Sequence, residues 1–530
     1  MNAQAQNPQA QNPQDPQADR RSGPGQRGAQ ADPDAVRFWR LMSEGIAAGS
    51  NVGGALAKAC ELFGGTAMGQ AIAAVHADVM QHQQPLSQAM RAHPEAFDPR
   101  AVAVVEAGEY GGILDRVLPL IVEALEAGDP DRLASAGMPS REACQYVSDV
   151  LQKAQEARAS DLHFEPLPGS SSRVRIRVDG VLRVIDPPPA DLYRQVVTLL
   201  KLWGAMEPSQ RRLPQDGRCN MRRGVRLDIS VIPVHEGEQI VVRILRRAAG
   251  EVLLGLDRLG LSDADLPKVR RLAGLPWGLV VVTAPAGHGK TTILYSMLHE
   301  ANTPEAKILT VEDPVEVSFA GMGQMQIAPQ AGLTFARAIR AIIRQDPDVI
   351  MVGEIRDLET ANLCAQVALT GHLLLTTLHA DTAAAAVRRL VEMGLEPFRV
   401  SASMGGVIAV RLVRRLCPHC RKPAKPAEAV LPPAAREWLA GHPEATFYTG
   451  SGCDKCDGIG YRGRAGVFEV MMMSERLRQM VSEGAGVGAL RDAAVAEGMT
   501  TMLIDGLEKA AAGVTSITEL LAALPIAADR

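Results

Sequence analysis

Hydrophobic positions recur along this chain at two spacings, and the changes between them divide the sequence into parts. Residues 34–130 carry apolar positions at helical spacing, and the stretch RFWRLMSEGI puts its apolar side chains on one face. The stretch AVAVVEAGEYGGILDRVLPLIVEAL predicts two helices separated at Glu109–Gly112. We therefore expect an N-terminal helical bundle here, behind a Gln- and Pro-rich tail over 1–33 that should be disordered.

Alternation with a period of two dominates the next part, residues 140–248. A helical stretch, REACQYVSDVLQKAQEA, precedes RVRIRVDGVLRVI, VRLDISVIPV and QIVVRILRR, in which apolar and polar residues alternate. Such alternation is typical of strands with one buried face. We expect an α+β domain with an antiparallel sheet, flanked by linkers at 131–139 and 249–262.

Residues 263–410 combine short, almost wholly apolar runs with helical segments. The runs VVVTAP, ILTVED and VIMVGEIRD predict strands, and strands that alternate with helices indicate a mostly parallel α/β sheet. A cysteine-containing element follows over 411–470, and a small helical domain is predicted over 471–530.

Composition and charge restrict the class of protein. Hydrophobic residues make up 46% and charged residues 22% of the 530 positions, which suits soluble globular domains. The net charge of −4 gives no general attraction to nucleic acid. No apolar run is long enough to span a bilayer, and the polar N-terminus is unlike a signal peptide. We expect a cytoplasmic protein that binds no nucleic acid and reaches a membrane only through partners.

The most informative local motif is APAGHGKTTI at 284–293, directly after an apolar strand. Gly287 and Gly289 would let backbone N–H groups converge on a phosphate. Lys290 would reach the β- and γ-phosphates, and the Thr291 hydroxyl would bind Mg²⁺. Ala284 replaces the first glycine of G-x-x-x-x-G-K-[ST], which costs about 1 kcal/mol only where φ must be positive. The alternative is a glycine-rich turn that carries a lysine by chance.

Acidic residues end two further predicted strands. Glu354 follows the strand in DPDVIMVGEIRD, where a carboxylate can orient an attacking water or reach the metal. Glu312 and Asp313 end the strand in ILTVEDPVE. The stretch TGHLLLTTLHAD adds His372 and His379; a histidine there can sense a γ-phosphate, and a hydrogen-bonded core histidine is the alternative.

Four of these motifs together resemble those of a known family. The phosphate loop, EDPVE, DPDVIMVGEIRD and LTGHLLLTTLH are similar, in order and spacing, to the Walker A, Asp box, Walker B and His box of type II secretion and type IV pilus assembly ATPases (GspE/PilB-like secretion ATPases). SDLHFEP, RRLPQDGR, GEQIVVRIL and EGM…DGLEKAAAG extend the resemblance over 140–521. The resemblance implies a multidomain α/β homo-hexamer. In such a protein a RecA-like P-loop core follows a PAS-like α+β domain, and ATP is hydrolysed with Mg²⁺ between these two domains.

The resemblance also implies roles for single residues. Glu354 is the catalytic carboxylate, Glu312 assists at the metal or the water, and His379 senses the γ-phosphate. Arg340 and Arg344, which RAIRAIIRQDPD places on one helix face, could contact phosphate across a subunit boundary, or could simply be solvated. The implied nucleotide-binding residues are Gly287, His288, Gly289, Lys290, Thr291, Thr292 and, from QDGR in the second domain, Arg218.

Two departures from the family pattern concern the nucleotide site. The family loop is G-P-T-G-S-G-K-T-T, whereas this chain has A-P-A-G-H-G-K-T-T, so that His288 adds a bulky, titratable side chain. The family has an Asp-x-Arg step in the second domain, whereas Arg226 and Asp228 stand here in the opposite order. The exchange puts one nucleotide-contacting arginine in doubt, and we expect hydrolysis to survive at a reduced rate.

Two C-x-x-C pairs predict a structural metal site. Cys417 and Cys420 are separated from Cys453 and Cys456 by 32 residues. Each pair can chelate from a tight turn, and four thiolates suit tetrahedral Zn²⁺ with no open position. The placement, directly after the ATPase core, is similar to that in pilus and secretion assembly ATPases.

The helical N-terminal part has a resemblance of its own. QPLSQAM, HPEAFDPRAV and VEAGEYGGILDRVL are similar to a cytoplasmic domain of the GspF/PilC-type inner-membrane platform protein. Its AGE-x-G-x-L signature is matched by Ala107, Gly108, Glu109, Gly111 and Leu114. A generic helical bundle is the alternative. If the resemblance holds, a docking module is fused to the motor and positions it at the membrane platform.

These observations predict a hexameric ATPase that drives pilus or type II secretion pseudopilus assembly, peripheral to the inner membrane through the platform protein and other components on its cytoplasmic face. Two alternatives stay open. One is a transport ATPase of the type IV secretion class, which the tetracysteine element and the platform-like domain disfavour. The other is a nucleotide-binding scaffold with little turnover, which the altered loop allows.

Overall fold

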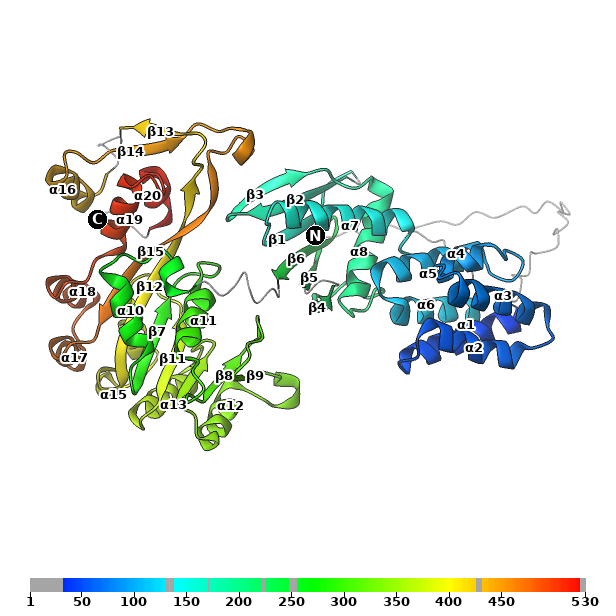
Figure 1. The fold of residues 1–530 in the computed structure, drawn as a ribbon, viewed down its shortest axis with the longest axis horizontal. Helices are drawn as coiled ribbons and strands as arrows, with labels where there is room; N and C mark the ends of the chain where they lie inside the picture. The colour runs from blue at the N-terminus through cyan, green and yellow to red at the C-terminus, as the bar shows by residue number, and fades with distance from the viewer. Residues whose placement is uncertain are drawn as a thin grey trace, which may run out of the picture.

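The computed structural model describes residues 32–129, 133, 138–169, 171–221, 225–246, 255–425 and 431–524. The predicted disordered tail, apart from residues 32 and 33, lies outside the described residues, as does most of the linker at 131–139. Three parts follow one another along the chain in Figure 1: a helical part, a smaller α+β part and a large α/β part. No helix among the described residues is long and apolar enough to cross a membrane.

The helical part consists of short helices whose starts are set by local capping. Asp32, Asn51 and Thr66 each accept a backbone N–H bond at the start of a helix. Gly112, at φ 66°, ends one helix in a left-handed conformation and separates it from the next, as the sequence predicts. The helices are α1 Pro33–Ala47, α2 Val52–Phe63, α3 Ala67–Gln81, α4 Leu86–Arg91, α5 Pro99–Gly111 and α6 Leu114–Glu126.

Glu109 explains part of the AGE-x-G-x-L signature. Its carboxylate accepts hydrogen bonds from the backbone N–H groups of Leu86 (2.6 Å) and Ser87 (2.9 Å), and so satisfies the free N-terminus of α4. Gly108 is required for packing, because a Cβ at this position would lie 2.4 Å from a methyl group of Val117. The signature therefore holds α4, α5 and α6 together.

Among its described residues, the α+β part has one antiparallel sheet and two helices. The strand order is β3-β2-β1-β6-β5-β4, and every pair is antiparallel, which confirms the prediction from the alternating stretches. The elements are α7 Arg141–Glu156, β1 Asp161–Pro166, β2 Ser172–Val178, β3 Val181–Ile185, α8 Ala190–Trp203, β4 Gln215–Asn220, β5 Val225–Val234 and β6 Gly237–Arg246.

The helical and α+β parts share a single hydrophobic core, which runs from Phe38 to Ile244. Trp203, at the end of α8, is 2% exposed and packs against Gly111, where a Cβ would lie 2.6 Å from its indole nitrogen. Arg116 of α6 donates from Nη1 to the carbonyls of Leu202 and Trp203, both at 2.5 Å. A guanidinium at a helix C-terminus satisfies free carbonyls and interacts favourably with the helix dipole.

The α/β part is built on a seven-stranded sheet in the order β15-β12-β7-β11-β10-β8-β9. All neighbours are parallel except the β12–β15 pair, which is antiparallel. The residues of β7, β10 and β11 are all buried, because helices cover both faces of the sheet. The mostly parallel α/β sheet that the apolar runs predict is confirmed.

The first elements of this part are those that precede β12. They are η3 Leu256–Arg258, α10 Asp265–Ala273, β7 Gly278–Thr283, α11 Lys290–Ala301, β8 Ile308–Glu312, β9 Met322–Gln326, η4 Pro329–Ala331, α12 Phe335–Ile342, η5 Ile343–Gln345, β10 Val349–Val352, α13 Leu358–Leu369, β11 Leu373–Leu378, α14 Ala383–Glu392 and α15 Pro397–Ser403.

The last elements carry the cysteine element between two long strands. They are β12 Met404–Leu416, β13 Arg421–Ala424, α16 Pro433–Gly441, β14 Phe447–Gly450, η7 Asp454–Cys456, β15 Tyr461–Met472, α17 Glu475–Ser482, α18 Val487–Ala496, α19 Met502–Ala511 and α20 Ile517–Ala523. Because β12 and β15 belong to the main sheet, the cysteine element is an insertion at its end.

Candidate active site

The phosphate loop joins the end of β7 to the start of α11. Gly287 (φ 76°) and Gly289 (φ 85°) adopt left-handed conformations, which glycine adopts without strain. Ala284 is fully buried and is not among the residues with positive φ, so that its side chain fits in place of the first glycine. The Lys290 ammonium donates to the Ala284 carbonyl at 2.9 Å and therefore folds back over the loop.

The two predicted acidic strand ends meet beside this loop. Glu312 ends β8, Glu354 follows β10, and the two strands are parallel neighbours. A cavity of about 150 Å³ lies between them. Its polar lining residues include Lys290, Thr291, Glu312, Glu316 and Glu354. The geometry brings together a cation, a hydroxyl and carboxylates, which is what a magnesium–phosphate group needs.

Glu312 is held rigidly from three sides. It is 3% exposed and accepts hydrogen bonds from the Tyr295 hydroxyl, the Thr310 hydroxyl (2.5 Å) and the Gln324 amide (3.1 Å). Three donors fix the direction of the carboxylate. This arrangement suits a positioning role better than proton transfer.

His379 lies beside two residues of the cavity lining, Lys290 and Glu354. The His379 ring nitrogen Nδ1 is 3.1 Å from Lys290 Nζ, and its Nε2 is 3.5 Å from Glu354 Oε2. Burial lowers the pKa of Lys290 to about 8, with Arg411 acting in the same direction and Glu354 opposing. His372, by contrast, lies at the opposite end of β11 and contacts the Val367 carbonyl through Nδ1 (3.2 Å).

The three arginines predicted from the sequence do not line this cavity, as far as the described residues show. Arg340 pairs with Glu359 at 2.7 Å on the surface. Helix α12 ends at Ile342, so that Arg344 lies in a 3₁₀ turn and donates to the Arg340 carbonyl. Arg218 is half-exposed on β4 and lies 3.7 Å from Asp228.

The four paired cysteines converge at the ends of β12 and β15. Their sulfur atoms all lie within 4.8 Å of one another, with Cys417–Cys453 at 3.9 Å, Cys420–Cys456 at 3.8 Å and Cys453–Cys456 at 3.7 Å. A tetrahedral Zn²⁺ with bonds of about 2.3 Å places its sulfur ligands about 3.8 Å apart. The backbone N–H of Gly460 donates to the Cys456 sulfur, which favours a thiolate. The cluster therefore fits zinc.

Comparison with known proteins agrees with this geometry. The family model "Type II/IV secretion system protein" matches residues 140–522. The chain belongs to the type II/IV secretion system protein family. A separate model, "Type II secretion system (T2SS), protein F", matches residues 38–130. The resemblances inferred from the sequence, for the motor and for the helical part, are confirmed.

Individual members of the secretion system family support the same conclusion. The chain is 40% identical over 384 residues to the Type IV pilus assembly ATPase PilB of Thermus thermophilus, of which it covers only 42%. It is 42% identical over 385 residues to the Type II secretion system ATPase E of Vibrio cholerae, covering 74% of that protein; each match spans 71% of this chain. The family therefore includes ATPases of both systems.

A solved structure supports the fold. The X-ray structure of the Legionella pneumophila ATPase DotB matches with a TM-score of 0.52 at 22% identity. The match covers 71% of this chain and 95% of DotB.

Arg226 belongs to the Arg–Asp pair that stands in the opposite order to the family pattern. It is 5% exposed on β5, and its Nη1 donates to the Val315 carbonyl in the ATPase part at 2.9 Å. Burial and Glu312 raise the pKa of Glu316, whereas Arg226 and a hydrogen bond with the Thr291 side chain act in the opposite direction. Arg226 thus places a cation beside the loop of residues 313–321 between β8 and β9, which carries Asp313 and Glu316 and is called the acidic loop below. Family motifs alone would not have found this contact.

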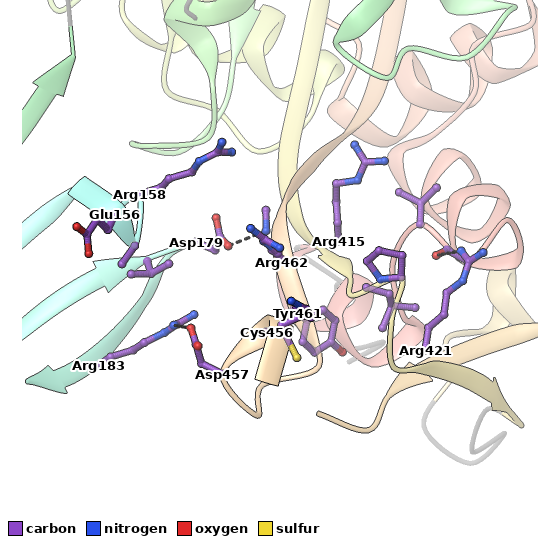
Figure 2. Close-up of a pocket in the computed structure, with 18 residues that line it drawn as sticks. Glu156, Arg158, Asp179, Arg183, Arg415, Arg421, Cys456, Asp457, Tyr461 and Arg462 are labelled. Atoms are coloured by element: carbon purple, nitrogen blue, oxygen red, sulfur yellow. Dashed lines mark hydrogen bonds and ion pairs between the residues drawn. The ribbon is translucent and has the colours of Figure 1, made fainter. Parts of the chain in front are cut away.

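The α+β part also contacts the base of the cysteine element. Asp179 accepts a hydrogen bond from the Gly463 N–H at 2.8 Å, and Arg183 pairs with Asp457 at 3.2 Å. Figure 2 shows the Arg183 and Asp457 side chains meeting one another; both line a cavity of about 650 Å³ between the two parts. Strand β15 is thus fixed to the α+β part at the residues that follow the second Cys pair.

Proposed function

We propose that this chain hydrolyses ATP as a homo-hexameric motor that drives assembly of a type II secretion pseudopilus or a type IV pilus. The observation that carries the proposal is that Lys290, Thr291, Glu312 and Glu354 line one cavity. His379 lies beside two of these residues, Lys290 and Glu354. Two acidic strand ends beside a phosphate loop suit a nucleoside triphosphate bound with Mg²⁺. The names of its relatives support both transport systems.

Each residue of the cavity has a proposed task. The backbone of Gly287–Gly289, with Lys290 and the first-turn residue Thr292, would hold the phosphates. Mg²⁺, when bound on Thr291, would neutralise phosphate charge. Glu354 would orient and deprotonate the attacking water, while Glu312 would hold the surrounding groups in place. His379 would contact the γ-phosphate and so distinguish ATP from ADP.

Arginines from elsewhere in the ring would complete the site. Arg340 and Arg344 lie on the surface of the ATPase part, which supports their use across a subunit boundary. We propose that the α+β part is PAS-like. Its movement would bring Arg218 into contact with the phosphates. Arg226 reaches the acidic loop in the present arrangement.

Zn²⁺ on the four cysteines would have a structural role, because the site has no open position. It would fix the ends of β12 and β15, which are strands of the main sheet.

The experiment is ATP hydrolysis by the full chain, with the mass of the assembly measured by light scattering. Lys290→Ala and Glu354→Gln are compared with Glu305→Gln, an exposed acid outside the cavity. A hexamer whose turnover is lost in the first two variants and kept in the third supports the motor. Nucleotide binding without turnover above that of Lys290→Ala would favour the scaffold instead.

We also propose that the helical part attaches the motor to the inner-membrane platform protein from the cytoplasmic face. The match of 38–130 to the protein F family supports this. Deleting the part would expose the shared core, so that substitutions are a better test. Leu62 and Met80 are 46% and 56% exposed on α2 and α3. Leu62→Asp with Met80→Asp should abolish membrane recruitment but keep ATP hydrolysis; unchanged recruitment would contradict the proposal.

A further inference from the structure

The phosphate loop is attached to strand β12 by one of its own side chains. His288 Nδ1 accepts a hydrogen bond from the backbone N–H of Leu412 at 3.0 Å. The ladder between β7 and β12 ends at the pair Thr283–Ala409, so that the Leu412 N–H lies three residues beyond it. His288 gives this amide a partner after β7 has ended. An amide without a partner in such a place is unfavourable.

A second contact holds the same loop to the neighbouring strand. The Arg464 guanidinium of β15 donates to the Gly287 carbonyl at 3.3 Å. Residues 287 and 288 are thus bound to the strand pair that carries the four cysteines at its end. Arg464 also lies near Asp179 of the α+β part, which accepts from Gly463.

We propose that His288 is a positioning residue: its neutral ring fastens the phosphate loop to β12, and protonation of Nδ1 releases the loop and weakens nucleotide binding. A protonated Nδ1 is a donor and repels the Leu412 N–H. The serine of the family pattern is too short to provide an acceptor at the position of Nδ1. This inference rests on the proposed nucleotide role of the loop, whereas the attachment itself can be measured without nucleotide.

The surroundings of His288 favour the neutral ring. Burial lowers its pKa below the usual 6.5, and Arg411 of β12, Arg464 of β15 and Lys290 of α11 act in the same direction. A lowered pKa means that the attachment is complete near neutral pH and is lost as the pH falls through the lowered value. The charged groups that face the ring from all three elements are cationic.

Asparagine and glutamine form a matched pair for the test. The Asn Oδ1 atom occupies the position of His Nδ1, whereas the Gln Oε1 atom lies nearer the position of Nε2. His288→Asn should therefore keep the acceptor without titrating, and His288→Gln and His288→Ala should lose it. Deuterium exchange at Leu412, followed by mass spectrometry on the full chain without nucleotide, reports the hydrogen bond directly. We expect exchange about three- to tenfold faster in the Gln and Ala variants than in the native chain and the Asn variant.

The second measurement is the dissociation constant of a non-hydrolysable ATP analogue at about pH 7.5 and about pH 5.5. Between the higher and the lower pH, the native chain should lose at least about threefold more affinity than His288→Asn loses. Because the two proteins differ only at residue 288, the difference isolates His288. Equal exchange at Leu412 in the Gln variant and the native chain would overturn the attachment. Equal pH dependence of the native chain and the Asn variant would overturn the release. If the loop bound no nucleotide, the exchange result would still decide the attachment.

Discussion

Arg226 and Val315 lie in different parts of the chain and are joined by a hydrogen bond of 2.9 Å. The donor comes from the antiparallel sheet of the α+β part, and the acceptor from the acidic loop beside the phosphate site. The guanidinium is almost wholly buried and also lies 3.1 Å from Asp228. Movement of the α+β part would therefore act directly on the loop that carries Glu316 and begins directly after Glu312.

Replacement of Arg226 by alanine should lower kcat/KM for ATP by about tenfold or more, because a buried hydrogen bond to a charged group contributes roughly 1.5–3 kcal/mol. Steady-state kinetics of the full chain measure this. Arg243→Ala is the control, because Arg243 also acts on Glu316 but is exposed and pairs with Asp161. We expect less than about a twofold effect there. Equal losses in the two variants would mean that the Val315 contact is not the cause.

His379→Asn should reduce kcat by roughly tenfold or more and leave ATP binding largely intact. The reason is that His379 lies beside Lys290 and Glu354, where negative charge develops during phosphoryl transfer. Single-turnover hydrolysis together with nucleotide affinity separates the two effects. His372→Asn provides the control, since its ring contacts the Val367 carbonyl. A loss of affinity without a loss of kcat in His379→Asn would contradict a role in the transition state.

Removal of the metal should loosen the end of the main sheet. We expect one zinc per chain by elemental analysis, and its loss in Cys453→Ser, with a lower temperature of unfolding and reduced ATP hydrolysis. Cys60→Ala is the control, because Cys60 lies on α2, far from the cluster in sequence and outside it in space. Full zinc content in Cys453→Ser would show that the four thiolates do not form one site.

The helical part should unfold together with the α+β part. Trp203→Ala removes the largest side chain of their contact and should destabilise both by about 3–5 kcal/mol. Gly111→Ala should cost about 1–3 kcal/mol, since its Cβ would overlap the Trp203 ring. Gly441→Ala has open space around the added Cβ and serves as the glycine control. Calorimetry should show a shared transition that moves in the first two variants only; a separate, unshifted transition of the helical part would refute the coupling.

The local elements followed from the sequence because their causes are local. The apolar runs of β7, β10 and β11 predicted buried parallel strands, and the alternating stretches predicted the antiparallel sheet. The phosphate loop followed from two glycines next to a lysine, and the four-cysteine cluster from the spacing of two Cys pairs. Each pattern depends on backbone conformation or chelation within a few residues.

The sequence by itself therefore determined the strands, the phosphate loop, the acidic strand ends and the four clustered cysteines. Only the tertiary structure decided that Arg226 reaches Val315, that His288 turns toward Leu412, and that Trp203 joins the helical part to the α+β part. These contacts join residues 89, 124 and 92 positions apart. Their partners are backbone groups or a glycine, which carry no side-chain signature that a motif could record. The packing of the three parts, and not any local pattern, brings them together.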